Sequence, residues 1–204
     1  MSGLSVPSHQ TLLDAIKRDH REILAFYTEY KAAAGNLDQQ ERWSNQLTWE
    51  IARHSIGEEL VVYPLMEKAL GDKGHALAEH DREDHQVVKD GLKKIEGLKV
   101  GSAEFDSTLK TIMDNLQEHI QTEEEQDFPQ LETAIGLEKS VETAKSFQRT
   151  KMFVPTRSHP SAPSKPPFET LAGLLAAPVD KLKDAFSKFP TDEQTESATA
   201  HIRN

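Results

Sequence analysis

The sequence predicts an all-α protein: an up-down four-helix bundle with an additional C-terminal helix, a proline-rich strap and short helices. Three observations lead to this fold class. Apolar residues recur every three or four positions along four long segments, which is the period of amphipathic helices. Aromatic residues make up 6% and charged residues 28% of the chain, a balance that favours a helical protein over a β-sandwich. At 204 residues, one domain with an extension can bury a hydrophobic core.

Four apolar stripes mark the helices of the predicted bundle, which spans residues 9–135. The first helix should end near Gly35 and Asn36. The second should begin near Asp38, because Glu41 three positions later is typical of a capping box. The turn at 71–74 and the loop at 97–102 are short, so neighbouring helices should be antiparallel. The stripes comprise Leu13, Ile16, His20, Ile23, Tyr27 and Tyr30; Leu47, Ile51, His54, Glu58, Val61 and Leu65; Leu77, Asp81, His85, Val88, Leu92 and Ile95; and Phe105, Leu109, Ile112, Leu116, His119, Glu123 and Gln126.

The chain after the bundle divides into three parts. A fifth helix is predicted within residues 136–154, from about Leu137 to Arg149. Residues 155–189 should form a proline-rich strap and short helices, because five of the ten prolines lie in 155–167 and exclude a helix there. Residues 190–204 lack apolar anchors, so a disordered tail is expected.

A shift of 65 residues superimposes two sets of metal-ligating residue types. Both sets read H-x-x-x-E-E-x-x-x-aromatic-P-x-x-E, and each is preceded by an Asp-His pair, Asp19-His20 in one half and Asp84-His85 in the other. Two half-sites that face each other would make a two-metal centre. The first set comprises His20, His54, Glu58, Glu59, Tyr63, Pro64 and Glu67, and the second comprises His85, His119, Glu123, Glu124, Phe128, Pro129 and Glu132.

The candidate ligands lie on the apolar stripes and not on the opposite, solvated faces. Residues four apart lie one above the other on a helix, so His54 with Glu58 and His119 with Glu123 each form a clamp. Burial of such groups without partners would cost several kcal/mol each, and a metal satisfies imidazole and carboxylate together. The predicted metal ligands are His20, His54, Glu58, His85, His119 and Glu123.

The chain contains no cysteine, which limits the metal ligands to nitrogen and oxygen atoms. Imidazole and carboxylate donors suit two iron ions, with manganese or zinc less favoured.

This order of ligands resembles the hemerythrin-like, HHE cation-binding family. The resemblance covers roughly residues 9–135 and rests on a lone His, an H-x-x-x-E on the second helix, another His, and a second H-x-x-x-E-E that runs into an aromatic-Pro pair. It implies a four-helix bundle that holds a non-haem di-iron centre and binds oxygen or related small molecules.

The second bridging carboxylate could be either of two neighbours. The repeat and the four-residue spacing from His119 favour Glu123. The better-known oxygen carriers of this family place that carboxylate five residues after the histidine, which here is Glu124.

His80 is a candidate for a further ligand. It has no counterpart in the repeat, because position 15 is Ala. A fifth imidazole would leave the two metals unequally coordinated, with one open to a small molecule. However, His80 lies five residues before His85, and Asp81 occupies the four-residue position as a substitute or an outer acceptor. His9, His75, His159 and His201 are expected at the surface.

Charge and hydropathy exclude several kinds of partner. A formal net charge of −10 argues against nucleic-acid binding. No run approaches the roughly 18 apolar residues of a membrane span, so no membrane partner is expected. The N-terminal residues show no secretory signal, which favours a cytoplasmic protein. The expected partner is a small diatomic or peroxide ligand, and the sequence identifies no protein partner.

Two functions follow from a His-rich centre with two carboxylates. The first is binding of oxygen, nitric oxide or a related small molecule, in a carrier, sensor or iron-binding role. The alternative is a di-iron oxidase or a peroxide-consuming detoxification enzyme. No Glu stands three residues before any His, so the Glu-x-x-His pair of carboxylate-rich di-iron enzymes is missing.

Overall fold

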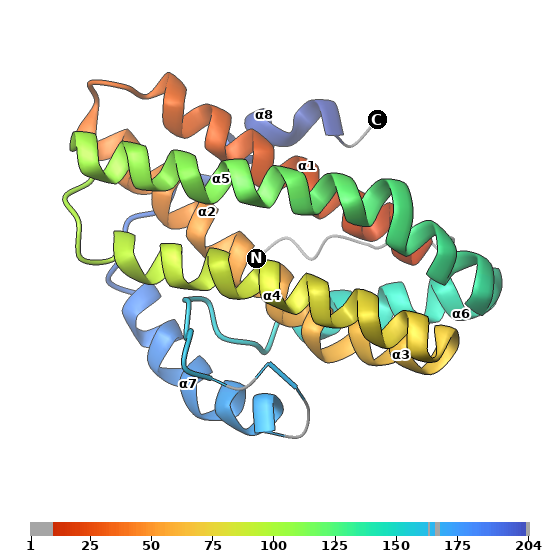
Figure 1. The fold of residues 1–204 in the computed structure, drawn as a ribbon. Helices are drawn as coiled ribbons and strands as arrows, with labels where there is room; N and C mark the ends of the chain where they lie inside the picture. Colours follow the sequence, from red (N-terminus) through yellow and green to blue (C-terminus); the bar gives the residue numbers. More distant parts are fainter. Residues whose placement is uncertain (1–9, 163, 166–167, 203–204) are drawn as a thin grey trace.

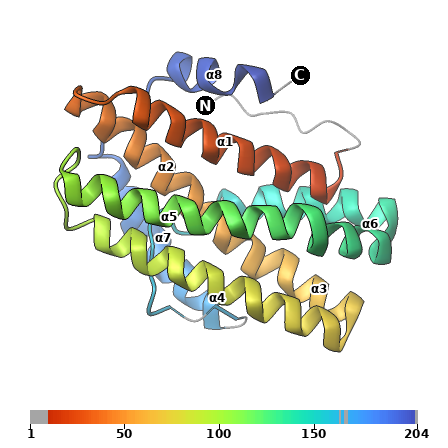
Figure 2. The ribbon, with the colours of Figure 1, turned by 45° about the horizontal axis from the view of Figure 1, so that its top comes forward.

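A computed structural model describes residues 10–162, 164–165 and 168–202. Residue 9 of the predicted bundle, and residues 163, 166, 167, 203 and 204 of the predicted strap and tail, lie outside these ranges. Every regular element in the described ranges is helical. Four long helices run side by side, α1 (Leu12–Ala32), α2 (Leu37–Gly57), α4 (Asp72–Ile95) and α5 (Ala103–Thr122) (Figures 1 and 2). The predicted all-α, up-down bundle is confirmed.

Polar side chains fix where three of the bundle helices begin. Thr11 caps α1 in a capping box with Asp14, and Ser102 caps α5. Helix α2 begins one residue before the expected Asp38, because the side chain of Asn36 accepts a hydrogen bond from the amide of Gln39. These caps satisfy amides at the helix ends that have no partner within the helix.

Two π-helical segments interrupt the regular helices, and they lie at corresponding positions of the repeat. They are η1 (Glu58–Val62), which leads into α3 (Tyr63–Leu70), and η2 (Glu123–Asp127), which leads into α6 (Phe128–Lys151). The amide of Tyr63 donates to the carbonyl of Glu58, five residues earlier, and Phe128 does the same to Glu123. A proline follows each of these residues and has no amide to continue the four-residue pattern.

In the chain that follows each candidate glutamate ligand, the π segments change which residues are buried. The sequence predicts that Val61 and Leu65 face the core, whereas the structure buries Val62 and Met66 completely. In the second half, the expected Gln126 is exposed and Asp127 is buried. The extra residue in each wide turn rotates the following helix by about one position, which the apolar periodicity does not reveal.

Two apolar clusters fill the bundle on either side of the candidate ligands. One cluster includes Ile23, Phe26, Trp43, Leu47, Leu92, Leu109 and Leu116, and the other includes Leu12, Ile16, Val62, Met66, Ala78, Phe128 and Leu131. Along α1, His20 lies between the two clusters, as does His85 along α4. A layer of buried polar side chains therefore crosses the middle of an apolar core.

Helix α6 continues well past the bundle. Gly136 has a φ of 74° and a ψ of 168°, which a residue with a side chain rarely adopts, and the helix bends there. The segment after the bend covers the predicted fifth helix. It packs against α1 and α2, so that the end of α6 lies beside the polar layer.

A buried carboxylate on helix α7 (Phe168–Asp184) fastens the proline-rich strap. One oxygen of Asp180 accepts hydrogen bonds from the amides of Thr156 and Arg157, both at 3.2 Å. The same oxygen lies 2.8 Å from Nε2 of His159. His159 was expected to be an ordinary surface residue, but it is the ion-pair partner of this carboxylate. The strap and α7 together cover one side of the bundle, beside α2 and α4 (Figure 1).

The C-terminal segment is helical, which corrects the expectation of a disordered tail. It forms α8 (Asp192–Thr199) and a short 3-10 turn, η3 (Ala200–Ile202), which lie against α1 (Figure 2). Thr191 and Gln194 make a capping box at its start, and Ile202 is buried at its end. The cap and the apolar contacts of Ala198 and Ile202 stabilise this short helix because the bundle provides a surface for it to pack against. No helix in the described ranges is long and apolar enough to cross a membrane.

Substitution of Asp180 should release the strap. We expect Asp180→Ala to lower the free energy of unfolding by about 1–3 kcal/mol, because it leaves buried donors without an acceptor. Cleavage between residues 155 and 165 in limited proteolysis should increase. Asp114→Ala, at an exposed carboxylate on α5, is the matched control and should behave as the wild type. Equal proteolysis of the two variants would contradict the role of Asp180.

This contribution should also depend on pH. Burial raises the pKa of Asp180, but the hydrogen bonds from His159 and the strap amides more than offset this and hold the pKa below the ordinary value of 3.8. The stabilisation is therefore present above that value and is lost as the pH falls through the lower pKa of the folded state. The stability difference between wild type and Asp180→Ala should disappear in acid.

Candidate metal centre

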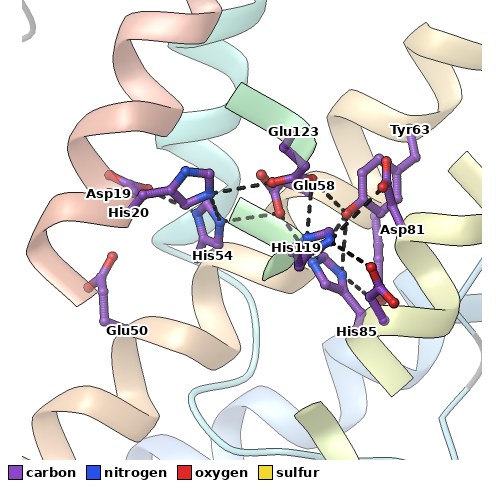
Figure 3. A network of polar contacts seen from close by, with 12 residues as sticks. Asp19, His20, Glu50, His54, Glu58, Tyr63, Asp81, His85, His119 and Glu123 are labelled. Atoms are coloured by element: carbon purple, nitrogen blue, oxygen red, sulfur yellow. Dashed lines mark hydrogen bonds and ion pairs between the residues drawn. The ribbon is translucent and has the colours of Figure 1, made fainter. Parts of the chain in front are cut away.

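Six buried side chains from four helical segments meet in the middle of the bundle (Figure 3). They form two groups that share two carboxylates. The first half-site consists of His20 and His54 with Glu58 and Glu123, and the second consists of His85 and His119 with the same two glutamates. Within each group, ligand atoms of all four residues lie within 4.8 Å of one another. The structure thus brings together all six residues that the repeat selects.

Each histidine directs Nε2 toward a shared carboxylate. The separations are 3.4 Å from His20 to Glu123, 3.3 Å from His54 to Glu58, 3.4 Å from His85 to Glu58 and 3.3 Å from His119 to Glu123. Each glutamate therefore contacts one histidine of either half-site, as a bridging ligand would. The clamp geometry expected for residues four apart is present in both halves.

The other ring nitrogen, Nδ1, faces a second carboxylate in every case. We call these four residues the outer carboxylates. Nδ1 lies 2.8 Å from Glu124 in His20, 3.0 Å from Glu59 in His85, 3.3 Å from Asp84 in His119 and 3.6 Å from Asp19 in His54. The outer carboxylates are themselves two pairs of the repeat. A carboxylate at Nδ1 favours the tautomer whose Nε2 carries a free lone pair, which is the form that binds a metal.

Several inner polar atoms of the centre lack hydrogen-bond partners within the described residues. Both oxygens of Glu58 and Oε2 of Glu123 accept no hydrogen bond. Nε2 of His20 lies 3.0 Å from Nε2 of His54, and two lone pairs at that distance repel each other. Buried polar atoms without partners are costly, and a cation bound between them would satisfy all of them together. The donor set therefore fits a pair of metal ions.

Protons and metal ions should compete for this centre. Burial lowers the pKa of His54 to about 4, so its ring is neutral and available at neutral pH. Burial and the neighbouring Glu123 raise the pKa of Glu58 well above its usual range. Burial also lowers the pKa of His119, but Glu123 and Asp84 outweigh it and hold that pKa well above 6.5. Metal binding would have to displace protons, so it should weaken as the pH falls.

The two half-sites differ in residues that the repeat does not match. The Tyr63 hydroxyl donates to Oε1 of Glu123 at 3.1 Å and lies 3.1 Å from Nε2 of His85, whereas its counterpart Phe128 has no hydroxyl. Asp81 is buried beside His119, and neither of its oxygens has a hydrogen-bond partner. The position that corresponds to Asp81 is Ile16. Both mismatches can be seen in the repeat, so a comparison of its two halves can identify Tyr63 and Asp81 as residues that make the half-sites different.

The structure places the two residues whose roles as ligands the sequence left open. The His80 side chain is 60% exposed and pairs only with Asp84, at 3.9 Å, because five-residue spacing points it away from the face that carries His85. It therefore does not make the two half-sites unequal. Glu124 is half-buried at Nδ1 of His20, and it is Glu123 that belongs to both groups.

Comparisons with known proteins agree with this site. The family model described as "Hemerythrin HHE cation binding domain" matches residues 11–131. The chain is 52% identical over 177 residues to a hemerythrin-like protein of Schizosaccharomyces pombe, and the alignment covers 87% of each chain. It is 23% identical over 144 residues to a DNA nickase of Nostoc sp. strain PCC 7120, covering 71% of this chain and 40% of that protein. No solved structure matches the chain. The protein belongs to the hemerythrin HHE cation-binding family.

Proposed function

We propose that the protein is a non-haem di-iron protein that binds oxygen, nitric oxide or a related small molecule, in a carrier, sensor or iron-binding role. The observation that carries the proposal is the pair of half-sites with two imidazoles each, joined by two carboxylates, three of whose four oxygens accept no hydrogen bond within the described residues. Four donors per metal leave positions open in the six-coordinate geometry that iron prefers with nitrogen and oxygen ligands. Manganese or zinc would use the same donors and are the less favoured occupants.

The surrounding residues suit the binding of a small neutral ligand. The apolar clusters above and below the polar layer exclude water. Iron would supply an open coordination position and an exchangeable electron. At the second half-site, the Tyr63 hydroxyl would donate a hydrogen bond to a ligand bound beside His85 if it turned away from Glu123, to which it donates in this structure. The first half-site has Phe128 at the corresponding position, so a polar ligand should prefer the second.

A di-iron oxidase or peroxide-consuming enzyme is the second candidate, and Asp81 favours it. Burial and the nearby Glu123 raise the pKa of Asp81 to about 8, so this carboxyl group holds a proton at neutral pH. Reactions that reduce peroxide consume protons, and a buried acid beside His119 could deliver them. A turnover assay separates this role from simple binding.

A nucleic-acid partner is not proposed. The relative named as a DNA nickase is much longer than the matched segment, which covers 40% of it. A formal net charge of −10 would repel a phosphate backbone.

The first test is the metal content of protein expressed with iron. We expect about two iron ions per chain in the wild type and a marked loss in His119→Ala, which removes one of two imidazoles from the second half-site. His201→Ala, at an exposed histidine of η3, is the matched control and should retain both ions. One ion per chain, or zinc kept in preference after iron loading, would contradict the di-iron assignment.

The second test separates binding from catalysis. The reduced, iron-loaded protein should be titrated with oxygen, and in a parallel titration with nitric oxide, while its visible spectrum is followed. A spectrum that reverts when the gas is removed supports the binding role. Irreversible oxidation with sustained consumption of peroxide supports the enzyme, and Asp81→Asn should then lower the turnover rate by about 100-fold or more. An Asp81→Asn variant with unchanged turnover would remove Asp81 from the mechanism.

A further inference from the structure

A buried lysine from the end of α6 reaches the outer carboxylate of the first half-site. Lys151 is 4% exposed, and its ammonium contacts carboxylate oxygens of both Asp19 and Glu50. The Asp19 oxygen that it contacts is the one that faces Nδ1 of His54. Lys151 lies 20 positions beyond residue 131, where the segment matched by the family model ends.

The second half-site also has a lysine at one of its outer carboxylates, although that carboxylate, Glu59, corresponds in the repeat to Glu124 and not to Asp19. The ammonium of Lys89 lies 2.6 Å from both oxygens of Glu59, and Glu59 lies 3.0 Å from Nδ1 of His85. Lys89 is part of α4, within the bundle. The position 65 residues earlier is Leu24, so the repeat supplies no such lysine to the first half-site.

The packing around Lys151 holds its side chain against the first half-site. Arg53 donates from Nε to the carbonyl of Lys151 at 2.7 Å, which fixes the end of α6 on α2. Gly57 gives the side chain room, because a Cβ there would lie 3.2 Å from Cγ of Lys151 and 2.8 Å from a ring carbon of Phe147. The Phe147 ring, one helical turn before Lys151, stands at 87° to the His54 ring with 6.0 Å between centroids. Two residues of α6 therefore frame His54 from outside the bundle.

We propose that Lys151 is a positioning residue of the metal centre, which the C-terminal extension supplies to the first half-site, so that each half-site has one outer carboxylate bound by a lysine. It holds the Asp19 carboxylate 3.6 Å from Nδ1 of His54, as the nearest carboxylate to a buried ring nitrogen that makes no hydrogen bond within the described residues. The charge of this carboxylate favours a proton on Nδ1 and so orients the ring with Nε2 toward Glu58. The role in metal binding rests on the proposed function, whereas the role in orienting His54 concerns the protein alone. The extension is thus part of the centre and not only a cover on the bundle.

A control variant can be made at Glu50, the other carboxylate that Lys151 contacts. Lys151→Met removes the ammonium group from two buried carboxylates and leaves them with the more distant guanidinium groups of Arg18, 3.9 Å from Asp19, and Arg53, 3.4 Å from Glu50. This loss could prevent folding. The double variant Lys151→Met/Glu50→Gln removes one positive and one negative charge, so the cluster keeps its net charge. Glu50→Gln alone keeps the contact between Lys151 and Asp19. Lys145→Met replaces an exposed lysine of the same helix.

The first measurement uses the metal-free protein and the ¹⁵N resonances of its histidine rings. In the double variant, the Nδ1 and Nε2 resonances of His54 should move toward each other, as expected for a mixture of tautomers, while those of His119 stay in place. Glu50→Gln and Lys145→Met should leave His54 unchanged, and Lys151→Arg should restore it. Unchanged His54 resonances in the double variant, or equal changes in His54 and His119, would overturn the proposal. This outcome does not depend on whether the wild type binds iron.

The second measurement is a titration with Co²⁺. Loss of the group that orients a ligating histidine should weaken one of the two bound ions by about 10–100-fold in the double variant. Lys89→Met should weaken one ion by a similar factor while changing the ring resonances of His85 in place of His54. An affinity for both ions equal to that of the wild type would overturn the role of Lys151 in metal binding. If the wild type itself binds fewer than two ions, the proposed function fails, and the ring resonances still decide whether Lys151 orients His54.

Discussion

The structure depends on six buried imidazole and carboxylate groups, several of whose inner atoms make no hydrogen bond within the described part of the chain. Two carboxylates shared between four histidines cannot all be satisfied by one another, because their lone pairs face inward at distances near 3 Å. The helices must therefore be held in position by the rest of the chain until a cation neutralises the centre. The two apolar clusters provide this support from either side, and the same clusters exclude the water that would otherwise solvate these groups. The centre therefore lowers the stability of the metal-free protein, and the apolar core around it offsets this cost.

The repeat gives the centre an approximate twofold symmetry that extends beyond the six inner residues. All four histidines are backed by carboxylates, and these carboxylates are also related by the repeat, Asp19 to Asp84 and Glu59 to Glu124. The departures from symmetry fall into two kinds. Tyr63 and Asp81 make the second half-site more polar than the first, which bears on where a ligand binds. Lys151 places at the first half-site a buried cation that has no counterpart in the repeat.

The C-terminal extension has two separate modes of attachment. The strap and α7 are joined by two carboxylates of α7: Asp180 accepts hydrogen bonds from two strap amides and pairs with His159, and Asp184 accepts hydrogen bonds from the side chains of Thr156 and Arg157. The end of α6 is joined by charges that continue to the metal centre through Asp19. The first attachment organises the surface of the molecule, whereas the second couples the extension to the chemistry of the site. A protein that consisted of residues 11–131 alone would keep the six inner residues but would lack the ammonium group beside Asp19.

The sequence was sufficient to predict the helical class, the four stripes and the six inner residues of the candidate centre. These features are local or periodic: clamps such as His54 and Glu58 lie within one helical turn, and the repeat relates the two halves without any knowledge of packing. The other features of the fold and the centre depend on tertiary packing. The π segments rotated the following helices, so that Val62 was buried in place of Val61. The tail became helical because α1 receives it, and His80 turned to the surface. Lys151 meets Asp19 across 132 residues of sequence. Periodicity shows which face of a helix is buried, but the partner of a buried charge is set by long-range packing, which no local pattern encodes.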